Sequence, residues 1–116
     1  MFVKIKLASN LAVGTVIAFD SSNQNWNNAS DASSMIGVIE KTPTQDNDGI
    51  FWANVRFSGS TVALADRDIP DEGGNLCVIN GRIFVDNSMN GCGIVAPNIA
   101  EQAARVANDL VMVNIR

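Results

Sequence analysis

Short apolar runs recur along the whole chain at intervals of about ten residues, separated by clusters of Gly, Asn, Asp and Ser. Residues 2–7 alternate in polarity, with Val3 and Ile5 on one face and Lys4 between them, which is the period of a half-buried β-strand. The runs predict strands over residues 2–7, 15–20, 35–41, 50–57, 60–65, 76–80, 82–86, 91–96 and 110–115. Strands at this spacing are typical of a small β-barrel or β-sandwich.

The connections between these runs carry turn signals. Asn80-Gly81 separates two apolar runs and predicts a hairpin, because both residues adopt positive φ with little strain. Asp48-Gly49 predicts a second tight reversal. Gly37 interrupts a strand and indicates either a bulge or a close backbone approach.

Residues 97–109 break the strand pattern. Asn98 followed three residues later by Glu101 is typical of a helix-capping box, and Ile99, Ala103 and Val106 would share one helical face. We therefore predict a mainly β fold, a small β-barrel or β-sandwich, with one short helix near the C-terminus. At 116 residues the chain is expected to form a single domain, residues 11–116, preceded by a strand or arm over residues 1–10.

Charged residues make up only 17% of the chain, against roughly 25% in typical soluble domains, so Asn and Ser supply much of the polar surface. Such a surface suits packed assemblies, in which few charges need to lose water. The net charge of −4 and the dispersed basic residues argue against nucleic-acid binding. The first apolar run is too short for a signal peptide, and none approaches the roughly 20 residues of a membrane span. We expect a soluble protein made in a cytoplasm.

Catalytic signatures are lacking. The chain has no histidine to serve as the base of a Ser-His-Asp or Cys-His site, and no Gly-rich phosphate loop. A glycosidase-type carboxylate pair stays open, since any chain with 12 acids contains possible pairs. Two cysteines without histidine cannot form a structural zinc site, so Cys77 and Cys92 are either buried thiols or a bridge between strands. We expect no catalytic residue, no cofactor and no bound metal.

Four acids, Asp66, Asp68, Asp71 and Glu72, precede a double glycine. They could offer oxygen ligands to calcium, but their spacing is not that of an EF-hand and Arg67 lies among them. We favour a solvated turn, anchored by Ile69 and reversed at Gly73 and Gly74.

Two tryptophans are candidate interface residues, because aromatic side chains are enriched in interface hot spots. Trp26 lies in an Asn/Ser-rich segment and either folds back over the sheet as a lid or contacts another subunit. Phe51 and Trp52 are neighbours on one strand, so alternation allows only one of them to point inward.

The first strand also has two interpretations. It is either the first strand of the domain's own sheet, or an arm that adds itself to the sheet edge of a partner through unpaired backbone groups.

The order of elements resembles the compact β modules of tailed-bacteriophage virions, in which a G-x-V-x-A-x-D strand is followed by an I-G-V strand, a strand ending in G-x-V, an I-x-x-G-x-x-L turn and a second I-G-V-like strand. The matching residues are Gly14, Val16, Ala18 and Asp20; Ile36, Gly37 and Val38; Gly59, Thr61 and Val62; Ile69, Gly73 and Leu76; and Gly93, Ile94 and Val95. The match covers most of the chain after Leu11.

Free-standing chains of this length look most like head decoration (cement) proteins. The resemblance implies a structural protein on the capsid exterior that binds the major capsid protein as a homotrimer and stabilises the shell. It also implies that the arm residues, Phe2, Val3, Lys4, Ile5 and Lys6, contact the capsid. A tail fibre or baseplate module is the first alternative. A carbohydrate-binding barrel that uses Trp26 and Trp52 is the second.

Overall fold

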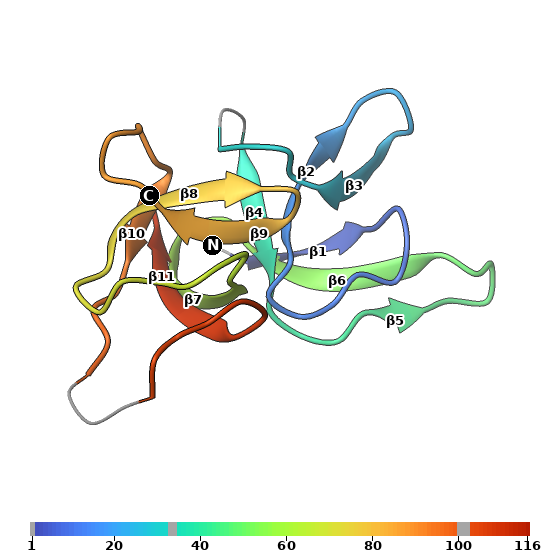
Figure 1. The fold of residues 1–116 in the computed structure, drawn as a ribbon. Helices are drawn as coiled ribbons and strands as arrows, with labels where there is room; N and C mark the ends of the chain where they lie inside the picture. Colours follow the sequence, from blue (N-terminus) through green and yellow to red (C-terminus); the bar gives the residue numbers. More distant parts are fainter. Residues whose placement is uncertain (1, 33–34, 100–102) are drawn as a thin grey trace.

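A computed structural model describes all residues except 1, 33–34 and 100–102. The described residues form eleven strands in two antiparallel sheets (Figure 1). The strands are β1 (Phe2–Lys6), β2 (Val16–Asp20), β3 (Asn25–Asn28), β4 (Ile36–Ile39), β5 (Thr44–Gln45), β6 (Phe51–Arg56), β7 (Gly59–Leu64), β8 (Gly74–Ile79), β9 (Arg82–Val85), β10 (Gly93–Val95) and β11 (Leu110–Ile115). The first sheet has the order β1-β6-β4-β2-β3, with β5 paired to β6, and the second has the order β7-β11-β10-β8-β9.

The two sheets share one apolar core. Alternate residues of β2 and β4 in the first sheet, such as Val16 and Val38, pack in one cluster with inward residues of the second sheet, such as Leu76, Val95 and Val113. A second cluster lies on the opposite face of the first sheet and contains Ile5, Leu7, Ile17, Ile39, Ala53 and Val55. Consecutive residues, such as Val16 and Ile17, therefore enter different clusters, because successive side chains of a strand point to opposite faces.

The architecture corrects the predicted barrel. The strands form two antiparallel sheets rather than one closed barrel, although the outer strands of each sheet touch at one bridge. Leu7 bridges Trp26 between the ends of the first sheet, and Ala65 bridges Ile83 between the ends of the second. The mainly β part of the prediction is confirmed.

The predicted C-terminal helix was wrong, since no described residue is helical. Glu101 of the expected capping box lies outside the described residues. Asn98 instead donates its backbone N–H to the carbonyl of Asp71 and its side-chain amide to the carbonyl of Ala103. The backbone N–H of Ile69 donates to the carbonyl of Arg105. Hydrogen bonds to a distant loop thus hold the described residues near Asn98 and Arg105 in a non-helical backbone, where local propensity alone favoured a helix.

The turn predictions were confirmed. Asn80 and Gly81 have φ of 46° and 81° and join β8 to β9, as expected for an Asn-Gly hairpin. Gly49, with φ of 80°, reverses the chain between β5 and β6. Gly37 marks a close approach: an added Cβ would lie 2.3 Å from Cγ1 of Val55.

The molecule measures 46 × 27 × 23 Å along its principal axes. The β5–β6 hairpin projects at one end of the long direction, away from the second sheet (Figure 1). Within the described part of the chain, no helix is long and apolar enough to cross a membrane.

Candidate interaction surfaces

The structure places all five proposed arm residues in β1, which pairs antiparallel with β6 from Phe2↔Arg56 to Lys6↔Trp52. Ile5 is buried in the second apolar cluster, and Lys4 and Lys6 are exposed on the opposite face. For Phe2 and Val3 only the backbone is described. β1 is thus a strand of the chain's own sheet in this structure, and contact of these residues with a capsid stays a prediction.

Trp26 lies on β3 and folds over the second apolar cluster. Its ring packs edge-on against Phe19, with centroids 5.7 Å apart, and against Phe57 at 5.3 Å. Its backbone carbonyl accepts a hydrogen bond from Ala8 at 2.8 Å. This is the lid that the sequence allowed as one alternative, and a contact of Trp26 with another subunit remains a prediction.

Trp52 faces the other way. Phe51 packs against the second apolar cluster, so Trp52, the next residue of β6, points to the other face, with Lys6 as its cross-strand partner. Further along β6 this face carries Arg56 and is turned toward the second sheet. The indole N–H donates to Oδ2 of Asp46 at 2.9 Å. The two tryptophans therefore lie on different faces of one sheet, and the structure does not assemble a shared sugar-binding platform from them.

A groove of about 280 Å³ surrounds Trp52 on this face. We call it the lysine groove; its lining residues are Lys4, Lys41, Thr42, Thr44, Trp52, Ala53 and Asn54. Lys4 is the cross-strand partner of Asn54, and Thr44 is that of Trp52, so β1, β6 and β5 together set their spacing. Sequence reasoning named Lys4 and Trp52 separately, but nothing in the sequence brings Lys41 and the threonines to them.

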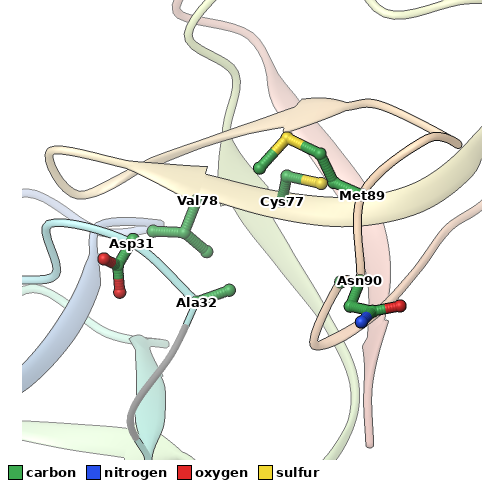
Figure 2. Close-up of a pocket in the computed structure, with 7 residues that line it drawn as sticks. Asp31, Ala32, Cys77, Val78, Met89 and Asn90 are labelled. Atoms are coloured by element: carbon green, nitrogen blue, oxygen red, sulfur yellow. The ribbon is translucent and has the colours of Figure 1, made fainter.

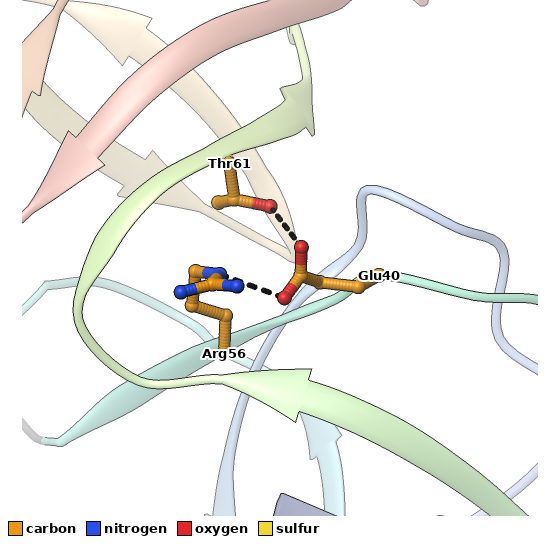
Figure 3. Close-up of polar contacts among 3 residues, drawn as sticks. All are labelled: Glu40, Arg56 and Thr61. Atoms are coloured by element: carbon orange, nitrogen blue, oxygen red, sulfur yellow. Dashed lines mark hydrogen bonds and ion pairs between the residues drawn. The ribbon is translucent and has the colours of Figure 1, made fainter. Parts of the chain in front are cut away.

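A polar link that sequence reasoning missed joins the two sheets (Figure 3). Arg56 of β6 donates its Nε–H to Oε1 of Glu40 at 2.7 Å, and the hydroxyl of Thr61 on β7 donates to Oε2 at 3.3 Å. Arg56 and Thr61 lie 16 and 21 residues from Glu40 in sequence, so no local sequence pattern predicts these contacts. Both carboxylate oxygens of this half-buried acid are thereby occupied.

The acidic segment is a turn, as favoured. Ile69 is buried, and positive φ is found at Gly73, just before β8, and at Gly74, its first residue, with values of 70° and 148°. Asp66 forms an ion pair with Arg67 at 2.9 Å, rather than turning toward a cation site shared with the other acids. Among the described residues, no group of three or more His, Cys, Asp or Glu side chains is placed to hold a metal ion.

Both cysteines are free thiols. Cys77 lines a cavity of about 460 Å³ together with Asp31, Ala32, Val78, Met89, Asn90 and Gly91 (Figure 2). Burial raises the pKa of the Cys77 thiol and also that of Cys92. Each thiol is therefore protonated at neutral pH and is a poor nucleophile.

The outer side of the second sheet carries exposed apolar residues. Leu110 and Met112 of β11 point outward beside Leu64 and Val62 of β7, their cross-strand partners. We call this surface the apolar face; it comprises Val62, Leu64, Ile94, Ile99, Leu110 and Met112, of which Ile94 is 59%, Ile99 70%, Leu110 51% and Met112 52% exposed. A groove of about 480 Å³ runs along it. Clustered exposed apolar residues mark a surface suited to protein contacts.

Comparison with known proteins gives a likeness of fold. No family model matches the chain, and no curated protein matches it. A solved structure does match: the N base of head fibre gp8.5 of bacteriophage phi29, with a TM-score of 0.63 and 15% sequence identity. The alignment covers 100% of this chain and 95% of that one. At this identity the likeness establishes that the two chains share a fold.

Proposed function

We propose that this chain is a non-enzymatic structural protein of a bacteriophage virion, carried on the outside of the head, where it binds the lattice of the major capsid protein and stabilises the shell. The observation that carries the proposal is the match of the whole chain to a phage head fibre base. The virion-module pattern in the sequence points the same way. The fold offers two surfaces for contacts with other chains, one on each sheet.

The apolar face is the proposed contact between copies in a homotrimer. Its residues belong to β7, β10 and β11 of the second sheet and to the segment after β10. The capsid contact is assigned to β1, on the first sheet. Three β1 strands held in one trimer would each bind weakly, but effective concentration would make their combined attachment tight.

A second candidate is the base of a head fibre, favoured because the matching structure is itself the N base of a phage head fibre. In that case the chain would seat a longer fibre on the shell rather than cover the lattice. The tail fibre or baseplate alternative differs from both in its place on the particle.

Electron cryomicroscopy of purified particles tests these alternatives. We expect density that fits the two-sheet fold on the outside of heads, as three copies around each attachment point. Repeated density across the lattice supports a decoration protein, and density confined to the foot of a projecting fibre supports a fibre base. Density on tails, or no density on the virion, overturns the proposal.

A further inference from the structure

All three lysines of the chain, Lys4, Lys6 and Lys41, lie on the same face of the first sheet around Trp52. The other charged groups on this face are few. Arg56 and Glu40 neutralise one another in the ion pair. Asp46, next to Trp52, is held by hydrogen bonds from two backbone N–H groups and the indole, and Asp48 lies beyond it in the hairpin turn. A chain of net charge −4 thus carries a locally positive groove.

Lysines on an outer strand have an ordinary explanation, since Lys4 and Lys6 would discourage a second copy from pairing with β1. Lys41 does not fit that explanation. It follows β4 after Glu40, and only the fold brings it to the same groove as Lys4. Lysines from two distant segments thus meet beside one indole, which indicates a ligand-binding site.

We propose that the lysine groove binds a negatively charged sugar residue. The indole of Trp52 supplies an apolar floor for a pyranose ring. The ammonium groups of Lys4 and Lys41 pair with the carboxylate or phosphate of the sugar. The hydroxyls of Thr42 and Thr44 and the amide of Asn54 can donate to and accept from sugar hydroxyls.

The lining favours a sugar over an acidic peptide. A space of about 280 Å³ with five hydrogen-bonding side chains suits one small polyhydroxylated ring, whereas a docked peptide needs apolar pockets for anchoring side chains. The site does not use the apolar face, but it shares Lys4 with β1, to which the capsid contact is assigned above. Binding of a sugar by the isolated chain needs no capsid, so it can be tested separately from the structural function proposed above.

Proton–nitrogen NMR of the indole groups provides a site-specific test, because the chain has two tryptophans and only Trp52 lines the groove. The full chain is titrated with trigalacturonic acid, sialyllactose and mannose 6-phosphate. The controls are methyl-esterified trigalacturonate, which has the same backbone without charge, and a triglutamate peptide. We expect at least one acidic saccharide to shift the Trp52 signal and leave the Trp26 signal in place, and both controls to have no effect.

Two double variants distinguish the effect of the groove lysines from the effect of lowering the overall positive charge. Lys4→Gln combined with Lys41→Gln should weaken saccharide binding by at least about a hundredfold, because each lysine contributes one charge-assisted hydrogen bond worth about tenfold or more. Arg67→Gln combined with Arg116→Gln removes the same charge elsewhere and should leave binding unchanged. A Trp52 signal that no acidic saccharide moves overturns the proposal. So does an equal response to triglutamate, which would indicate recognition of charge alone.

Discussion

At the scale of single residues, the tightest constraint in the first sheet is the absence of a side chain at Gly37. This glycine of β4 is buried, and an added Cβ would lie 2.3 Å from Cγ1 of Val55 and 3.0 Å from the ring of Phe57. Its φ lies outside the left-handed region, so the conflict is one of space. The glycine lets β6 side chains pack directly against the backbone of β4.

Gly37→Ala should therefore lower the free energy of unfolding by about 1–3 kcal/mol, the usual cost of overpacking a core. Urea denaturation followed by fluorescence measures it. Combining Gly37→Ala with Val55→Ala removes the main clash, so the double variant should be less destabilised than the sum of the two single variants. Strict additivity would show that the contact with Val55 is not the cause.

Ile5 tests whether β1 is integral to the fold. Its side chain is buried in the second apolar cluster, whereas Lys6, one residue later, is exposed. Ile5→Ala should cost about 2–5 kcal/mol of unfolding free energy, and Lys6→Ala less than about 0.5 kcal/mol. Equal, small effects in the same urea experiment would mean that β1 is a loosely attached arm.

At the scale of elements, the β5–β6 hairpin depends on one carboxylate. Hydrogen bonds from the Trp52 indole, then from the backbone N–H of Ile50, hold the pKa of Asp46 below its usual value of 3.8. A lowered folded-state pKa means that these bonds stabilise the hairpin fully above pH 3.8 and are lost as the pH falls through the folded-state value.

We therefore expect the Trp52 indole proton signal to move in an NMR titration below pH 3.8, with an apparent pKa beneath that value. Asp46→Asn should abolish this transition while leaving the Trp26 signal unaffected, because Trp26 packs on the other face of the sheet. A Trp52 signal that stays constant down to the pH of global unfolding would contradict the assignment.

The sequence was a good guide to elements whose pattern is set locally. The strand over 110–115 was predicted with its observed bounds, because alternate buried and exposed positions follow its side chains. β3 and β5 were missed. β5 is polar throughout and β3 is polar except for Trp26, and both exist because β2 and β6 offer them backbone partners. The helix prediction failed because long-range hydrogen bonds at Asn98 and Arg105 outweigh the local helical preference of the described residues around them.

The candidate sites were also predictable only where the sequence signal is local. Lys4 and Trp52 stand out in the sequence by residue type, and the alternation of Phe51 with Trp52 predicts that one of them faces outward. Their meeting with Lys41 depends on the pairing of β1, β6 and β5, which no short pattern encodes. The contact of Glu40 with Thr61 is likewise a product of how the two sheets pack.

At the scale of the whole molecule, the two sheets present different surfaces to possible partners. The first sheet carries the lysines around Trp52, near the projecting β5–β6 hairpin, and the second carries the apolar face. Like charges repel one another in a symmetric contact, whereas exposed leucine and methionine lose water favourably on association. Self-association is therefore expected through the second sheet, with the first sheet left for other partners.

Leu110→Ser combined with Met112→Ser tests this arrangement. Burying one leucine or methionine side chain contributes about 1.5–3 kcal/mol, so losing two should weaken each contact between copies at least about a hundredfold. Analytical ultracentrifugation should then find a trimer for the natural chain and a monomer for the variant. Asn114→Ser, on the same outward side of β11, should remain trimeric. A natural chain that is monomeric at all concentrations contradicts the proposed trimer. A variant that stays trimeric would show that the contact between copies lies outside the apolar face.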